Sequence, residues 1–545
     1  MNAASTKMNE QEIIKTIYEG KKEDRISAVV ALTSSKSRET LDALIYATKA
    51  DSLHLRRAAS IAIGKSGNVQ GIPTLINLLR NDLEERVRWN AAIALSYYST
   101  PTITDYVRNA SNTNNRENWM LSFLATNKNN FPEYKTYLER GLKHSDDFIR
   151  SLTVTNIARL DWDNYRDKII GLANDPSPAV REASYAAIWE NDKEIFEKFI
   201  PQIEKDEDEH IRAFALYQKK SGESAEISTQ MEDRFIACIL GGAIGDALGG
   251  PIEGHRYSKI KEKFGRVKDF VNYKYTFGEP RESGEWTDDT DMALTVSQAL
   301  IEQGFIHPND LAARFGKDMR QIDINEKKQR GYAAFSISRQ RKNYAGINWR
   351  FISDNSRGCG SVMRAHPIGL FYEGNNKAII KAARDSSIVS HSGEDAIAST
   401  ILLAYVVSRA LHLEKGFDRN MFGEECIAFI KPYSTDLADR IANIRKDQKL
   451  EIHELAEKYG GNGHTRTVSL ALECFLRYSD SYEETVTHAI NHSGDSDSVG
   501  SMAGAIAGAY LGTNAIPQRY KNGVYKREML EMTAKNLYTA YLARN

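Results

Sequence analysis

The first 220 residues repeat with a period of 31 to 32 residues, and this feature restricts the fold more than any other in the chain. An arginine marks most of the frames, and the frame without one falls at Trp119. The marks are Arg25, Arg56, Arg88, Arg150, Arg181 and Arg212. Each mark begins an apolar phrase such as RRAASIAIG or REASYAAI, and several frames add a second apolar segment such as GIPTLINLL. One frame is therefore predicted to form two short helices.

A helix with this pattern has a narrow apolar side that it cannot bury alone, so neighbouring frames must stack into a continuous core. The sequence predicts a helical lead-in over residues 1–22 and an α-solenoid over residues 23–220. Acidic residues stand just before several marks, among them Asp24, Glu84 and Asp146, and they predict structural ion pairs between repeats. The phrase resembles the HEAT-like repeat. This resemblance implies a protein partner on the repeats, with a purely architectural role as the alternative.

The composition is 41% hydrophobic and 27% charged, which excludes a wholly disordered or collagen-like chain. A formal net charge of -1 gives no reason to expect nucleic acid or a membrane surface as a partner, although a local basic patch stays open. Four cysteines stand far apart without a Cys-x-x-Cys motif, which favours reduced thiols in the cytoplasm over disulfides. Neither a secretory signal nor a membrane-spanning segment is predicted.

A polar segment over residues 221–230 is predicted to be a linker to a second domain over residues 231–545. In this domain glycines stand four apart from Gly241 to Gly249, and again from Gly500 to Gly512. Glycines at this spacing share one side of a helix and let another helix backbone approach closely. Because the runs are too short for membrane helices, and one contains Asp246, we expect tightly packed helices in a bundle.

Two short clusters of acidic and hydroxyl residues each precede an apolar helix pattern. The first reads TDDTD from Thr287 to Asp291, and the second reads DSDS from Asp495 to Ser498. Such carboxylates repel each other unless a helix N-terminus or a hard divalent cation compensates their charge. The first cluster taken alone fits a helix cap with a solvated acidic turn. Two clusters far apart in the sequence could instead meet around one or two Mg²⁺-like ions.

Between the clusters, the segment GCGSVMRAHPIG begins at Gly358. Its glycines, its hydroxyl group and Arg364 could offer donors and a charge to a diphosphate. The segment matches neither the P-loop nor the dinucleotide-binding fingerprint, so a tight turn before a helix is the alternative. A further segment, SHSGEDA, begins at Ser390.

A resemblance to the ADP-ribosylglycohydrolase family, which includes the dinitrogenase reductase-activating glycohydrolase, rests on four segments in one order. They read ILGGAIGDALGGPIEG, WTDDTDMAL, GCGSVMRAHPIG with SHSGEDA, and GDSDSVGSMAGAIAGA. The resemblance covers residues 231–545. It implies an all-α domain with a binuclear Mg²⁺ site, or Mn²⁺ in some members, that cleaves the bond between ADP-ribose and a side chain.

Carried over by position, the resemblance implies metal ligands at Thr287, Asp288, Asp289, Asp495, Asp497 and Ser498. The family's second motif usually carries threonine at both hydroxyl positions, where this chain has serine. Glu253 matches a mobile glutamate near the scissile bond, and Glu253 and Asp289 are the two candidates for the base. The implied substrate-binding residues are Gly358, Cys359, Gly360, Ser361 and His391, with a helix-cap role as the alternative for His391.

We therefore expect an all-α protein whose C-terminal domain is a Mg²⁺-dependent hydrolase of an ADP-ribosylated protein. The arginine linkage is favoured, and the repeats are expected to recognise the target protein. The competing hypothesis is a non-catalytic scaffold that binds ADP-ribose or ADP-ribosylated proteins. An oxygen ligand at every metal position favours the enzyme.

Overall fold

The computed structural model describes most of the chain. The described residues are 10–98, 115–125, 134–208, 210–212, 228–273, 281–324, 331–332, 339–340, 342–343, 346–353, 358–460 and 463–544. They form helices and turns, with one isolated antiparallel bridge between Tyr273 and Arg281 and no strand. The predicted all-α class is confirmed. Residues 1–9 of the predicted lead-in and residues 221–227 of the predicted linker lie outside the described residues.

The chain divides into two compact units. The first comprises Met1–Phe196 with Ala345–Asn348, and the second comprises Glu197–Tyr344 with Trp349–Asn545. The second unit therefore begins before the predicted linker, within the sequence of the last repeats.

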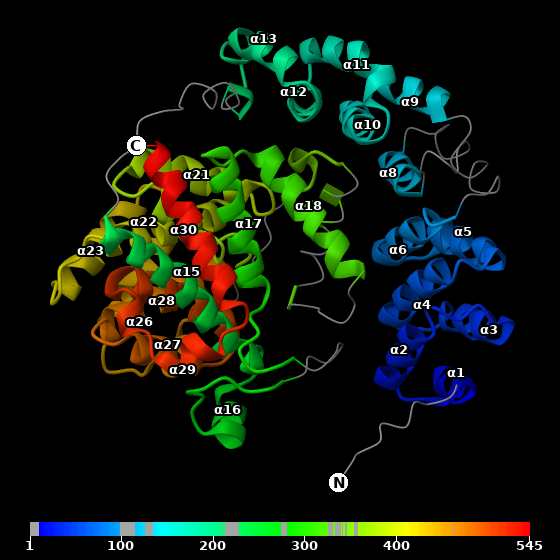
Figure 1. The fold of residues 1–545 in the computed structure, drawn as a ribbon. Helices are drawn as coiled ribbons and strands as arrows, with labels where there is room; N and C mark the ends of the chain where they lie inside the picture. Colours follow the sequence, from blue (N-terminus) through cyan, green and yellow to red (C-terminus); the bar gives the residue numbers. More distant parts are fainter. Residues whose placement is uncertain are drawn as a thin grey trace. The chain divides into compact units, whose positions relative to one another are not determined.

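The first unit is a succession of short helices arranged in pairs (Figure 1). The helices are α1 Glu10–Glu19, α2 Lys22–Ala31, α3 Arg38–Ala47, α4 Leu53–Ser66, α5 Ile72–Asn81, α6 Glu85–Leu95, α8 Arg116–Ala125, α9 Tyr134–Leu142, α10 Asp147–Leu160, α11 Trp162–Gly171, α12 Pro178–Asn191 and α13 Lys193–Ile203, of which α13 continues into the second unit. Along α2, α4, α6, α8, α10 and α12, each helix contacts the next, so the frames stack side by side. This arrangement confirms the predicted solenoid of helix pairs.

Ion pairs between arginines and carboxylates join successive frames of the solenoid. Arg56 lies 2.8 Å from Asp82, a carboxylate that stands further from the next mark than the acids singled out in the sequence. Asp146 does pair, with Arg116 at 2.7 Å. Arg116 thus replaces the arginine that is missing at Trp119, whose ring is buried in the core of the repeat.

The second unit is a bundle of helices (Figure 1). Its helices are α15 Thr229–Gly249, α16 Tyr257–Phe264, α17 Asp288–Gln303, α18 Pro308–Ile324, α20 His366–Phe371, α21 Asn376–Ile388, α22 Glu394–Ala410, α23 Arg419–Ile430, α24 Thr435–Lys446, α25 Ile452–Lys458, α26 His464–Tyr478, α27 Tyr482–Ile490, α28 Ser496–Leu511, α29 Gln518–Gly523 and α30 Arg527–Arg544.

The two glycine stripes pack directly against each other, α15 against α28. A Cβ atom on Gly245 would lie 2.0 Å from the carbonyl oxygen of Gly500, and one on Gly241 would lie 2.5 Å from that of Gly504. These distances leave no room for a side chain, so glycine is required there. The predicted close packing is confirmed, except that Gly512 ends α28 with a φ of 78° instead of joining the contact.

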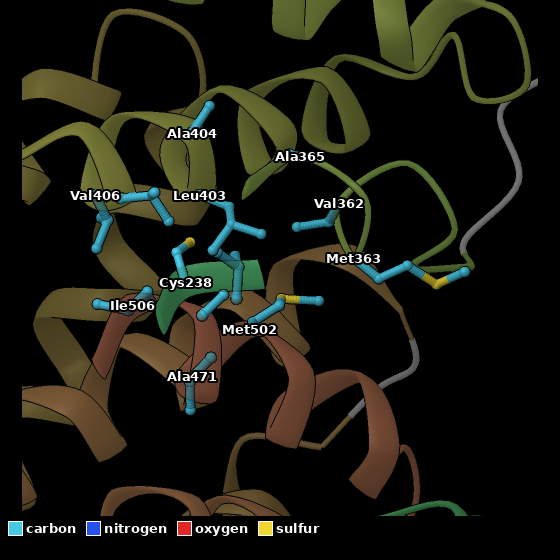
Figure 2. Packing of buried hydrophobic residues seen from close by; sticks show 14 of the residues in the cluster. Cys238, Val362, Met363, Ala365, Leu403, Ala404, Val406, Ala471, Met502 and Ile506 are labelled. Atoms are coloured by element: carbon cyan, nitrogen blue, oxygen red, sulfur yellow. The ribbon is translucent and has the colours of Figure 1, made fainter. Parts of the chain in front are cut away.

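Apolar side chains fill the core around this helix pair (Figure 2). Cys238 from α15, Leu403 from α22, Ala471 from α26 and Met502 from α28 are all buried. Val362, from the turn that follows the predicted diphosphate loop, is buried in the same cluster. The loop therefore begins from a close-packed support.

The stretch Thr229–Ile252, which contains α15, is long and apolar enough to cross a membrane by length and composition, with a mean hydropathy of 1.6. The sequence prediction of no membrane-spanning segment overlooks this stretch. Since 94% of its window is buried inside the protein, the core of the bundle accounts for its apolar character.

The end of the repeat sequence packs within the second unit. His210 is 8% exposed, and its ring meets that of Trp349 edge-on at 5.3 Å between centroids. Its Nδ1 lies 3.5 Å from Asp385, and its carbonyl oxygen lies 3.3 Å from Nε2 of His307. These contacts explain why the second unit begins at Glu197.

A fragment of residues 197–545 is therefore expected to unfold several degrees above a fragment of residues 231–545. The shorter fragment lacks His210, so it uncovers Trp349 and leaves His307 without its carbonyl partner. Losses of this kind cost about 1–3 kcal/mol each, and each kcal/mol is worth roughly 2–4 °C in a large domain. Scanning calorimetry of the two fragments measures the difference. Equal midpoints would mean that these contacts contribute no stability.

Candidate active site

The first acidic cluster begins α17 and is held in place by Asp246 of α15. The backbone N–H groups of Thr287 and Thr290 donate to its carboxylate at 2.9 and 3.0 Å, and both hydroxyl groups donate to it at 2.6 Å. Asp246 thus caps α17 from another helix. Burial raises the pKa of Asp246, and the four donors act in the opposite direction.

The cap interpretation of this cluster holds, but the predicted solvated turn does not. Thr287 is fully buried and Asp289 is 2% exposed, while Asp288 is half-buried. The carboxylates therefore face the interior of the domain instead of bulk water.

The second acidic cluster lies at the beginning of α28, next to the end of α15. A Cβ atom on Gly249 would lie 2.5 Å from the backbone of Asp497, so the two helix ends are in direct contact. Asp495 stands at the N-cap, and Asp497 and Ser498 lie in the first turn, both 2% exposed. Thr287 Oγ1 lies 3.4 Å from Asp497 Oδ2. The two clusters therefore meet.

The loop after α15 carries Glu253 to the same place. The Gly254 N–H donates to the carbonyl oxygen of Gly494 at 2.8 Å, which joins this loop to the residue before the second cluster. Burial raises the pKa of Asp288 and of Asp497 well above the usual range, and the negative charge of Glu253 adds to that effect in both. Glu253 therefore lies beside both clusters.

The charge of this region calls for a cation. Burial and the neighbouring carboxylates raise the pKa of Asp289 well above its usual range. Its Oδ1 atom is buried and has no hydrogen-bond partner among the described residues. Buried carboxylates and hydroxyl groups are the ligands that hard divalent cations such as Mg²⁺ prefer, so the residues present fit such an ion.

The site is not a finished metal cage as its side chains lie. In the described part of the chain, no group of three or more His, Cys, Asp or Glu side chains has the arrangement of a metal site. The carboxylates would therefore have to turn toward an ion as it binds.

The glycine-rich segment lies against the second cluster. Cys359 Sγ is 3.1 Å from Asp495 Oδ2 and 3.2 Å from Ser498 Oγ. Burial raises the pKa of the Cys359 thiol well above its usual range, so the thiol is neutral. Ser361 is fully buried and accepts a hydrogen bond from Thr400 at 3.1 Å. Its side chain supports the turn, which leaves the partly exposed residues 358–360 for a ligand.

His391 lies against the same segment and is 1% exposed. A Cβ atom on Gly360 would lie 3.1 Å from His391 Cε1. Burial lowers the pKa of His391 well below its usual range, so the ring is neutral. The helix-cap alternative receives no support, because α22 has Gly393 at its N-cap and no side-chain hydrogen bond there.

The predicted site residues thus gather around the polar end of the α15–α28 pair. They are Glu253, Thr287, Asp288, Asp289, Gly358, Cys359, Gly360, Ser361, His391, Asp495, Asp497 and Ser498. Sequence reasoning missed Asp246 and Thr290, which hold the first cluster. The available signal was an acidic residue alone in an apolar, glycine-striped helix, where a buried charge needs donors.

A separate cavity of 370 Å³ lies among α22, α24 and α26. Its lining residues are Asp395, Asp436, Asp439, Arg440, Asn443, Tyr459 and Thr465. None of the predicted site residues lines it. Its acidic lining alone identifies no ligand.

Comparison with known proteins adds two family matches. A family model described as ADP-ribosylglycohydrolase matches residues 227–545, and one described as HEAT repeats matches residues 11–96. An uncharacterised protein of Archaeoglobus fulgidus is 31% identical over 313 residues, which cover 57% of this chain and 98% of that protein. ADP-ribosylhydrolase ARH3 of Bos taurus is 26% identical over 348 residues, 56% of this chain and 93% of its own. ADP-ribosyl-[dinitrogen reductase] glycohydrolase of Rhodospirillum rubrum is 25% identical over 292 residues, 53% and 88% respectively.

Proposed function

This chain belongs to the ADP-ribosylglycohydrolase family, and we propose that it is a Mg²⁺-dependent hydrolase that removes ADP-ribose from a modified protein recognised by its HEAT repeats. The observation that carries the proposal is the meeting of both acidic clusters with Glu253 and the glycine-rich segment. A buried carboxylate oxygen of Asp289 without a partner supports the metal. A protein that only bound ADP-ribose would not need this concentration of buried acids.

The metal ligands in this proposal are Thr287, Asp288, Asp289, Asp495, Asp497 and Ser498. Bound Mg²⁺ supplies positive charge that orients the ribose hydroxyl groups and polarises water. Asp246 keeps Thr287 and Thr290 in place while the neighbouring carboxylates turn. The charge of the ligand set is high, which favours two ions over one.

Glu253 is the better candidate for the base. Its carboxylate lies beside both clusters and is half-buried, whereas a metal-bound carboxylate such as Asp289 accepts a proton poorly. A Glu253 oxygen takes one proton from the attacking water, whose oxygen bonds to C1″ of the ribose. The C1″ bond to the protein side chain breaks, and the departing nitrogen or oxygen atom receives a proton, so that ADP-ribose and the free side chain are released.

The linkage is the finer part of the proposal, and arginine is the first choice. The test is release of ADP-ribose by the full chain from two peptides that differ only in an arginine-linked or a serine-linked group. Faster release from the arginine-linked peptide supports the choice, and faster release from the serine-linked peptide reverses it. An Asp497→Ala variant run in parallel shows whether either activity belongs to this site.

The proposal places the protein in the cytoplasm. Its four cysteines are free, and Cys238, Cys426 and Cys474 are buried, so none forms a disulfide that an oxidising compartment would provide. Fractionation of cells that express the tagged protein tests this assignment.

The first unit carries exposed aromatic residues of the kind that protein interfaces use. Tyr18 and Tyr46 are 41% and 45% exposed, and their rings lie 4.7 Å apart. The Arg25 guanidinium lies 5.8 Å from the Tyr46 ring. Tyrosine and arginine are enriched among the residues that dominate binding energy, so this patch supports a protein partner on the repeats.

Deletion of residues 1–196 is expected to lower kcat/KM on the native ADP-ribosylated protein by about 10-fold or more, which corresponds to about 1.4 kcal/mol. On a small ADP-ribosyl conjugate the deletion should change little, because the acidic clusters and the glycine-rich segment all remain. Steady-state kinetics on both substrates measures the two ratios. Equal losses would mean that the repeats support the site itself, and the recognition role would have to be abandoned.

A further inference from the structure

A buried arginine behind the glycine-rich segment plays no part in the proposed reaction so far. Arg364 is fully buried and, among the described residues, forms no ion pair with a carboxylate. Its guanidinium lies 4.6 Å from the Phe315 ring, and burial lowers its pKa to about 9. Burying an unpaired charge costs several kcal/mol, so its neighbours must use the charge. Because the side chain is enclosed, it does not offer its charge directly to a diphosphate, as the sequence suggested.

The donors of Arg364 go to two segments of the site. NH1 donates to the carbonyl oxygen of Gly360 at 2.9 Å, which fixes the turn of the glycine-rich segment. NH2 donates to Ser390 Oγ at 3.0 Å and to the carbonyl oxygen of Ser386. One planar group therefore sets the position of the glycine-rich segment relative to the residue that precedes His391.

The hydroxyl group of Ser390 passes this arrangement on to His391. Arginine can only donate, so Ser390 Oγ accepts from Arg364 and keeps its own O–H free to donate. His391 Nδ1 lies 2.8 Å from Ser390 Oγ. The ring is neutral, so a proton donated to Nδ1 by Ser390 leaves the ring's own proton on Nε2.

His391 Nε2 is the free end of this chain of hydrogen bonds. It is buried and has no hydrogen-bond partner among the described residues. It belongs to a ring in contact with Gly360, at the segment predicted to hold the diphosphate. A buried donor without a partner is costly, and a ligand oxygen at this point would satisfy it.

We propose that Arg364 is a positioning residue that, through Ser390, holds His391 with its proton on Nε2, directed at an oxygen of the ADP-ribose group. The same guanidinium fixes the Gly360 carbonyl, so the backbone of the segment and the histidine donor are set by one group. The ligand part of this inference rests on the proposed function, whereas the position of the proton does not.

The position of the proton is measured by NMR on the full chain labelled with ¹⁵N-histidine. Loss of signals in His391→Gln assigns the residue among the 12 histidines. The expected result is a protonated Nε2 and an unprotonated Nδ1, with a mixture of both forms in Ser390→Ala and in Arg364→Lys. Ser387→Ala is the matched control, because the Ser387 hydroxyl bonds to the carbonyl oxygen of His391 at 2.9 Å and not to its ring. A protonated Nδ1 in the wild type, or an unchanged ring in both variants, would overturn the inference.

The effect on the ligand is measured by calorimetric titration of the same proteins with ADP-ribose in the presence of Mg²⁺. Ser390→Ala is expected to weaken binding about 10-fold, because the donor is no longer held on Nε2. The Gln side chain in His391→Gln places an amide N–H near the position of Nε2 and needs no serine, so adding Ser390→Ala there should change the affinity less than about twofold. An equal loss in both backgrounds would contradict the relay. A wild type that fails to bind ADP-ribose would refute the proposed function, and the NMR result would still decide the position of the proton.

Discussion

Asp497→Ala and Asp288→Ala are each expected to abolish hydrolysis while the protein stays folded. Both carboxylates are predicted metal ligands, and loss of one removes charge stabilisation worth about 10³-fold or more in rate, on the order of 4 kcal/mol. The fold should survive because burial raises the pKa of both groups. A raised carboxylate pKa means that folding disfavours the ionised form, so removing one carboxylate relieves repulsion at neutral pH.

Two measurements test this prediction independently. Turnover of an ADP-ribosylated peptide should fall to background in both variants, and Asp291→Ala, in the same cluster but outside the predicted ligand set, should stay within about threefold of the wild type. In thermal unfolding, Mg²⁺ should raise the midpoint of the wild type but not that of Asp497→Ala. Without metal, the variant's midpoint should equal or exceed that of the wild type. Wild-type turnover by either alanine variant would refute the metal assignment.

Gly245→Ala is expected to destabilise the second unit by about 3 kcal/mol or more. The new Cβ atom would lie 2.0 Å from the Gly500 carbonyl oxygen and 2.4 Å from its carbon, and neither backbone can yield without separating α15 from α28. The separation would also move Asp246 away from Thr287, so the first acidic cluster would lose its anchor. Urea unfolding monitored by circular dichroism measures the loss.

Gly242→Ala on the same helix is the matched control for this prediction. Its Cβ atom would lie 3.5 Å from Ala505 Cβ and from His366, which is ordinary van der Waals contact. Alanine is favoured over glycine in a helix by about 0.8–1.0 kcal/mol, so this variant should be neutral or slightly stabilised. Equal destabilisation by both substitutions would mean that helix propensity or general crowding, and not the contact with Gly500, decides the stability.

The sequence predicts the parts of this fold that depend on local periodicity. The 31-residue period is enough to predict paired helices that stack, because each helix has an apolar side that only a neighbour can bury. The spacing of Gly241, Gly245 and Gly249 is enough to predict a close helix contact, because a row of missing side chains has few other uses in a folded bundle. Both predictions need only residues that are near each other in the chain.

The features that the sequence does not predict depend on pairs of residues far apart in it. Asp246 caps a helix that begins 42 residues later, and nothing in either segment names the other. Cys359 turns its thiol toward the second acidic cluster because of the turn that follows it, which a string of glycine and serine does not specify. The start of the second unit at Glu197 depends on the contact of His210 with Trp349, although the repeat pattern continues through His210 without a break.

The most direct test of the account is the rate of ADP-ribose release from a modified protein by the full chain before and after removal of divalent metal. The account predicts that EDTA stops the release, that excess Mg²⁺ restores it, and that Asp497→Ala shows no release under either condition. Release that continues at the same rate in EDTA would contradict a metal site built from the two acidic clusters. Binding of ADP-ribose without any release, with Mg²⁺ present, would leave only the scaffold interpretation.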